Sequence, residues 1–138
     1  MANDADALIG AGNEALKAAQ WDAAEEAFLA ALDLGESGDA LFGLGIARWW
    51  SGEAEQSVRC WERAYTAFQK SAEPGQAVLT AGYLCLAYRM SLGNDAAARG
   101  WLAKASGLVE EFELAPMRAW VLICHAYTAN DTRRRSVV

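Results

Sequence analysis

The chain has 138 residues, of which 54% are hydrophobic and 22% charged, and it contains only two prolines. This composition is typical of a packed, largely helical protein and excludes a disordered chain. The net charge of −6 divides into −8 on residues 1–130 and +2 on the last eight residues, which argues against nucleic-acid binding by the folded body because phosphates require Lys and Arg partners.

Three cysteines, Cys60, Cys85 and Cys124, are widely spaced and form no CxxC pair. Neither a disulfide framework nor a zinc site is expected, and we expect no metal and no cofactor. The N-terminus lacks the basic and long apolar regions of a signal peptide, and no stretch reaches the roughly 18 apolar residues of a membrane span. The sequence therefore predicts a cytoplasmic protein without a membrane partner.

Two copies of one pattern of small and bulky residues occupy the N-terminal half, and Gly45 of the second copy follows Gly12 of the first by 33 residues. A period of this length is typical of helix-turn-helix repeats. The matching positions are Leu8, Gly12, Ala24, Phe28 and Ala31 in the first copy and Leu41, Gly45, Ser57, Trp61 and Ala64 in the second.

A third, weaker copy follows 41 residues later, because Gly93 matches the turn glycine Gly52. In this alignment Leu86 takes the small position of the first helix. The second helix carries Ala98, Leu102 and Ala105. A last apolar segment around Trp120 matches the first helix of a fourth copy.

Breaker residues separate seven helix-periodic segments, so the chain is predicted to be all-α. The expected helices are 4–19, 21–34, 39–50, 53–72, 75–91, 95–111 and 116–129. Asp39 and Asp95 are the expected N-caps of two of them.

The recurring residues explain how such hairpins stack. Small residues let helices approach, and the bulky Phe28, Trp61 and Leu102 fill the gap between successive hairpins. Because one hairpin leaves an apolar face exposed, stacking is needed to bury it. We therefore predict an α–α superhelix (solenoid) of about three hairpins, ended by a seventh, capping helix with a polar outer face. One domain is expected at 1–130, with a flexible basic tail at 131–138.

The segment AGNEALKAAQWDAAEEAFLAAL resembles the tetratricopeptide repeat (TPR), and the likeness covers about residues 5–130. Arg48 departs from the family pattern, which has an aromatic residue there. The resemblance implies that the first helix of each hairpin lines a concave groove for a protein or peptide partner. The groove positions carried over in this way are Ile9, Asn13, Phe42, Ile46, Trp49, Trp50, Tyr83, Met90 and His125.

This groove is apolar and aromatic. Family members that bind acidic chaperone tails carry a clamp of Lys and Asn, of which only Asn13 has a match here, so we expect no acidic-tail binding. The alternative for each of these aromatic residues is that its ring lies in the core of the protein. Trp49 and Trp50 are informative because adjacent helical residues point about 100° apart, so one of the two is expected near the groove or an interface.

A longer segment, residues 47–111, resembles the N-terminal TPR-like region of actinobacterial LuxR-type transcriptional regulators. This second resemblance implies a regulatory, partner-sensing or self-associating domain. It supplies no DNA-binding unit, because the residues after Tyr127 are too few to form one.

Candidate catalytic groups are few. His125 is the only histidine, and Cys124 beside it lies on a different azimuth of the expected helix, which argues against a Cys–His nucleophile. The glycines of FGLGIARWW lie inside an expected helix with no strand before it, so they form no phosphate loop. We expect a protein that is not an enzyme.

The leading hypothesis is an interaction module that binds an apolar or amphipathic protein segment, with homodimerisation as another use of the same surface. The alternative is a regulatory domain that senses a small apolar molecule near Trp49, Tyr83, Met90 and His125. An enclosed cavity of roughly several hundred cubic ångströms would favour sensing, and an open groove would favour a partner segment.

Overall fold

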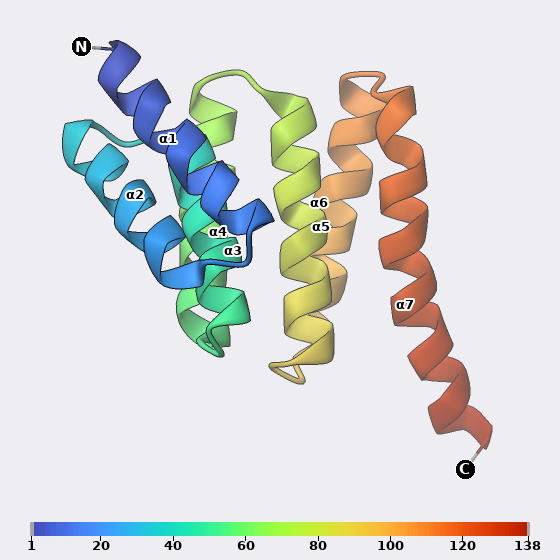
Figure 1. The fold of residues 1–138 in the computed structure, drawn as a ribbon. Coiled ribbons are helices and arrows are strands. Elements are labelled where there is room, and N and C mark those ends of the chain that lie inside the picture. Colours follow the sequence, from blue (N-terminus) through green and yellow to red (C-terminus); the bar gives the residue numbers. More distant parts are fainter. Residues whose placement is uncertain (1, 138) are drawn as a thin grey trace. The chain divides into compact units, whose positions relative to one another are not determined.

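The computed structural model describes residues 2–137, and the side chains of residues 4–129. Seven α-helices and one short 3₁₀ helix make up the regular structure of these residues (Figure 1). They are α1 (Ala2–Lys17), α2 (Trp21–Leu34), α3 (Gly38–Trp50), α4 (Ala54–Lys70), α5 (Pro74–Met90), α6 (Asp95–Glu111), η1 (Ala115–Met117) and α7 (Arg118–Val137). The prediction of an all-α chain with seven helices is confirmed within the described residues.

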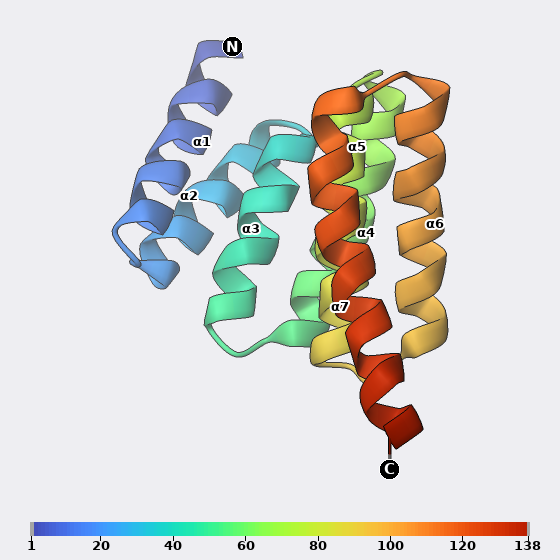
Figure 2. The same ribbon diagram turned by 90° about the vertical axis from the view of Figure 1, so that its right-hand side faces the viewer.

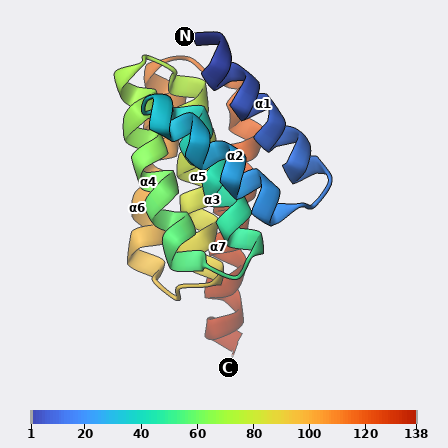
Figure 3. The same cartoon turned by 60° about the vertical axis from the view of Figure 1, so that its left-hand side comes forward.

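The chain divides into two compact units, Met1–Ser71 and Ala72–Val138, called here the first and the second unit. The first unit contains two helical hairpins, α1–α2 and α3–α4, and α2 packs against α3 (Figure 3). In the second unit α5 and α6 form a hairpin, and α7 packs against both of its helices (Figure 2). Successive helices of each unit therefore pair as the repeat pattern predicts.

The core of the first unit is organised around Phe28 of α2, which is fully buried. A Cβ atom added to Gly12 of α1 would lie 2.6 Å from the Phe28 ring, and one added to Gly43 of α3 would lie 2.3 Å from it. Both glycines thus make room for one ring between α1 and α3. This confirms the expected roles of Gly12 and Phe28, and it adds Gly43, which the repeat pattern did not single out.

The α3–α4 hairpin closes in a similar way around Trp61, which is 2% exposed. A Cβ atom on Gly45 would lie 2.3 Å from Nε1 of the Trp61 indole. That Nε1–H donates to the carbonyl oxygen of Phe42 at 3.1 Å, and the Ser57 hydroxyl donates to the carbonyl oxygen of Gly45 at 2.6 Å. The small residues Gly45 and Ser57 therefore let α3 and α4 approach as predicted, and the polar atoms among these residues are hydrogen-bonded. That Trp61 also fills the gap to the next hairpin stays a prediction.

In the second unit the third repeat differs from the predicted alignment by one residue. The turn between α5 and α6, residues 91–94, has four residues, whereas the turn between α3 and α4 has three. Cys85, not Leu86, is therefore the buried small residue of α5, and it packs with Leu102 of α6 and Cys124 of α7. The expected place of Leu102 in the core is confirmed.

The helix N-caps lie one or two residues before the predicted ones. The Ser37 hydroxyl accepts a hydrogen bond from the backbone N–H of Ala40, and the Asn94 side chain accepts one from that of Ala97 at 3.0 Å. Asp39 and Asp95 instead lie in the first turns, where their charges favour the helix dipole. The prediction of these two aspartates as N-caps was wrong.

The last helix also differs from expectation. α7 runs to Val137, so its backbone passes the predicted end at residue 129 and enters the expected tail, 131–138, whose side chains lie outside those described. Its predicted polar outer face is wrong, because Leu122, Ile123 and Tyr127 are 66%, 47% and 53% exposed. The domain boundary at residue 130 stays a prediction.

Candidate partner-binding surface

One face of α3 carries most of the predicted groove residues of the first unit. Phe42, Ile46 and Trp49 follow one another at helical spacing, so they share a face, and each is half-buried. Trp50, the last residue of the helix, is 62% exposed. The four side chains together form an apolar, partly solvent-exposed stripe, which we call the α3 face.

The α3 face rests on a buried aromatic ring. The Trp61 ring lies 6.4 Å from that of Phe42 and 5.9 Å from that of Trp49, centroid to centroid, and both pairs are tilted. Such spacings are typical of favourable aromatic pairs. Phe42 and Trp49 are therefore partly core residues, held by Trp61 on one side and open to solvent on another.

Trp50 has a different neighbour, as its helical position predicts. Its ring stacks on that of Trp21, the first residue of α2, with a centroid separation of 5.8 Å and an interplanar angle of 14°. We call this pair the Trp21–Trp50 stack. Sequence reasoning missed Trp21 as a surface residue, because only the packing of α2 beside α3 brings the two rings together.

The two predicted groove residues of α1, Ile9 and Asn13, differ in burial. Ile9 is half-buried and packs against the core cluster of the first unit, whereas Asn13 is exposed. Ile9 is thus mainly a packing residue. Asn13 remains available at the surface.

The remaining predicted residues lie in the second unit. Tyr83 is half-buried, and its ring tilts against that of Trp120 at 5.3 Å. Met90 follows Tyr83 by two turns on α5 and is 62% exposed, and His125 on α7 is also exposed. The structure pairs Tyr83 with Trp120, a contact that the groove alignment did not predict.

A polar link ties three helices together behind the α3 face. Nη2 of Arg48 lies 3.6 Å from Oε1 of Glu25 on α2, and its Nη1 donates to Sγ of Cys60 on α4 at 3.5 Å. Burial raises the pKa of the Cys60 thiol, and the Arg48 guanidinium offsets part of this effect. Arg48 therefore connects α3 to α2 and to α4 through polar contacts.

The chemistry of the thiols does not suggest a nucleophile. Burial raises the pKa of the Cys124 thiol to about 12, and burial also raises that of Cys85. Cys124 is buried while the neighbouring His125 is exposed, so the two side chains lie on different sides of α7. Among residues whose side chains are described, no group of three or more His, Cys, Asp or Glu is placed to hold a metal ion.

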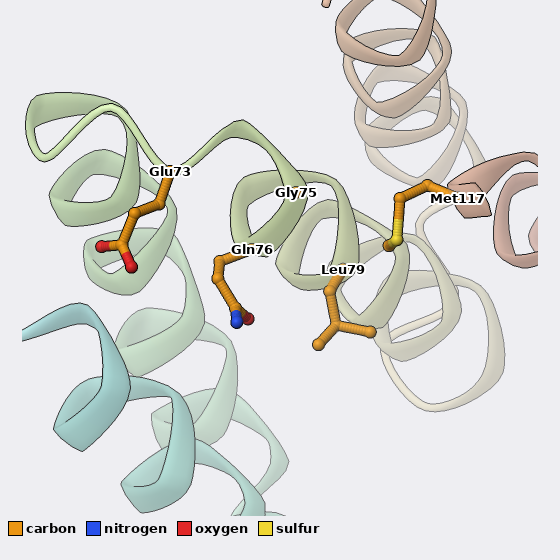
Figure 4. Close-up of a pocket in the computed structure, with 5 residues that line it drawn as sticks. All are labelled: Glu73, Gly75, Gln76, Leu79 and Met117. Atoms are coloured by element: carbon orange, nitrogen blue, oxygen red, sulfur yellow. The ribbon is translucent and has the colours of Figure 1, made fainter. Parts of the chain in front are cut away.

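A separate pocket of about 430 Å³ lies in the second unit (Figure 4). It is open to solvent, and its lining residues come from the start of α5 and from η1. They are Glu73, Gly75, Gln76, Leu79 and Met117. None of them is a predicted site residue, so this pocket does not support an enclosed small-molecule site near Trp49, Tyr83, Met90 or His125.

None of the described helices combines the length and the apolar character that crossing a bilayer requires.

Antiparallel hairpins joined through recurring small and bulky residues define an all-α helical-repeat fold. No family model matches the sequence, and no curated protein matches it. Among solved structures, the crystal structure of PcrH in complex with the chaperone binding region of PopB is similar over 92% of this chain and 96% of that chain, with a TM-score of 0.75 and 20% identity. This likeness confirms the predicted fold class.

Proposed function

We propose that this chain is a non-enzymatic interaction module that binds an apolar or amphipathic segment of another protein. The observation that carries the proposal is the α3 face, on which Phe42, Ile46 and Trp49 are only half-buried and Trp50 is 62% exposed. Large aromatic side chains on a rigid helix are preferred anchors for partners, because they bury much area and lose little entropy.

The comparison with PcrH supports this proposal. PcrH, which shares the fold, was crystallised with the chaperone binding region of PopB, so a helical array of this kind accommodates a segment of another protein. We extend this property to the present chain and assign the binding of the segment to the α3 face and the Trp21–Trp50 stack.

The side chains of the groove positions restrict the kind of partner segment that can bind. Ile9 and Ile46 occupy positions where clamp-type TPR modules have polar or basic residues, so a carboxylate would find no cation there. Apolar side chains spaced along a helix or an extended strand would instead fit the stripe. The partner is therefore a segment with periodic apolar anchors.

A selection of displayed random peptides on the purified protein tests the proposal. The enriched peptides are synthesised, and their affinities are measured by calorimetry for the wild type and for Trp50→Ala and Ile46→Ala. Leu34→Ala is the matched control, because Leu34 is a 56% exposed apolar residue of the same unit outside the α3 face. Circular dichroism verifies that each variant is folded.

We expect Trp50→Ala to weaken binding about tenfold or more, the effect of losing about 1.4 kcal/mol at an aromatic anchor. Leu34→Ala should bind like the wild type. A selection that enriches no peptide, or enriched peptides that bind both α3-face variants as tightly as the wild type, would overturn the proposal.

Other uses of the chain stay predictions. A homodimer through the same apolar area is measurable by light scattering. The sensing of a small apolar molecule and the regulatory role implied by the second resemblance remain alternatives to the binding of a protein segment.

A further inference from the structure

The surface charge of the two units differs strongly. Residues 1–71 contain twelve Asp and Glu against five Lys and Arg, a net charge of −7. Residues 72–130 contain five acidic and four basic residues, a net charge of −1. The α3 face and the Trp21–Trp50 stack therefore belong to a strongly acidic unit, whose field attracts cationic partners.

Two carboxylates also lie close to the stack in sequence. Asp22 directly follows Trp21 in the first turn of α2, and it is exposed. Glu53 is exposed in the turn after α3, and its backbone N–H donates to the carbonyl oxygen of Arg48 at 2.9 Å, which holds the turn against the helix end that carries Trp50. That end of α3 also bears the negative pole of the helix dipole.

The basic residues nearest in sequence to the stack are already engaged. Nζ of Lys17 lies 3.2 Å from Glu14, and Arg48 pairs with Glu25. Among the described side chains, no ion pair involves Asp22 or Glu53, the carboxylates nearest to the stack in sequence. An aromatic face next to carboxylates is a favourable site for an ammonium or guanidinium group.

In the second unit, a cation of the chain itself lies over an aromatic ring system. Nζ of Lys104 lies over the ring of Trp101, 4.9 Å from its centroid. In the described part of the first unit, no such cation is placed over Trp50. The contrast indicates that a cation on Trp50 has to come from a partner.

We infer that the segment bound by the α3 face carries a basic side chain, Arg or Lys, which stacks on the exposed face of Trp50 between Asp22 and Glu53. This inference rests on the proposed function and names the chemical class of its partner: a cationic amphipathic peptide segment. The apolar residues of the segment lie along the α3 face, and its basic residue occupies the Trp21–Trp50 stack.

Three synthetic peptides test the inference. They share the apolar residues of one peptide enriched on the wild type and differ at the flanking polar positions, which are all Arg, all Gln or all Glu. Affinities are measured by calorimetry at low and at high salt. We expect Arg to bind best and Glu worst, with about tenfold between Arg and Gln at low salt, and a smaller difference at high salt because exposed charges are screened.

Variants of the protein distinguish the stacking of a basic side chain on Trp50 from the general attraction of a cationic peptide to the acidic first unit. Trp50→Leu keeps an apolar side chain and should remove most of the preference for Arg over Gln. Trp101→Leu, the matched control, should keep it. The double variant Asp22→Asn/Glu53→Gln should reduce the preference, and circular dichroism verifies the fold of each.

The outcomes distinguish this inference from the proposed function. If the three peptides bind equally well, or if Trp50→Leu keeps the full Arg preference, the cationic site is disproved while the binding of apolar segments stands. If none of the three binds the wild type, both proposals fail.

Discussion

The ring of Phe28 occupies the space that a side chain on residue 12 would need: a Cβ atom on Gly12 would lie 2.6 Å from Cε1 of Phe28. Real Cβ atoms do not approach a ring so closely, and Phe28 is fully buried with no room to retreat. The contact between α1 and α2 therefore depends on the absence of a single methyl group.

Gly12→Ala should lower the free energy of unfolding by about 2 kcal/mol, because overpacking forces the helices apart. Gly10→Ala is the control in the same helix: a Cβ atom there meets nothing within 4 Å, so better helix propensity should raise stability by about 1 kcal/mol. Urea denaturation of both variants checks the difference. Equal effects of the two substitutions would show that the Phe28 ring does not limit the approach of the helices.

Ala19→Gly should stabilise the protein by about 1 kcal/mol. Ala19 lies between α1 and α2 and has a φ of 57°. This left-handed conformation is energetically unfavourable for alanine but not for glycine. The corresponding turns at Gly52 and Gly93 already have glycine with positive φ. Thermal unfolding measures the gain, and Ala11→Gly within α1 should show the opposite sign.

Asn94→Ala should destabilise the protein by about 1 kcal/mol, because the backbone N–H of Ala97 loses its side-chain acceptor at the start of α6. Asn94→Asp keeps an acceptor and should retain most of the stability. Chemical denaturation of the two variants provides the measurement. If Asn94→Asp were as destabilising as Asn94→Ala, the cap would not be the cause.

The buried thiols predict a loss of stability in alkali. Burial raises the pKa of Cys124 from an ordinary value of 9.0 to about 12, so between these values the unfolded chain has lost a proton that the folded chain keeps. The free energy of unfolding should therefore fall as pH rises from about 9 toward 12. Cys124→Ala should show a shallower decline than the wild type, and the same slope in both would contradict the assignment.

The repeat pattern predicted the parts of the fold that depend on residue size. Gly12 with Phe28 and Gly45 with Trp61 were recognisable because a small residue and a bulky one recur at fixed offsets. Gly43 was not recognisable from the sequence. The buried Phe28 ring contacts a glycine on each of two helices, whereas the repeat pattern pairs Phe28 with only one glycine. Gly82, where an added Cβ atom would meet the Trp120 indole, was not recognised from the pattern either.

The errors at the third repeat and at the caps have local causes. One extra residue in the turn before α6 shifts α5 relative to its predicted alignment, so that Cys85 replaces Leu86 as the small residue. Acidic residues are favoured both as caps and within the first turn, so sequence alone did not separate Asp95 from Asn94. The Trp21–Trp50 stack depends on packing between hairpins, about which neither residue carries a local signal.

The Trp21–Trp50 stack gives the protein an optical reporter of its own. Two indoles 5.8 Å apart couple their electronic transitions, as do those of Trp49 and Trp61 at 5.9 Å, but only the first pair has a largely exposed ring, that of Trp50. A molecule that settles on the exposed ring or separates the pair would alter the coupled circular-dichroism signal without any attached label. Occupancy at this place on the surface can therefore be followed in the unmodified protein.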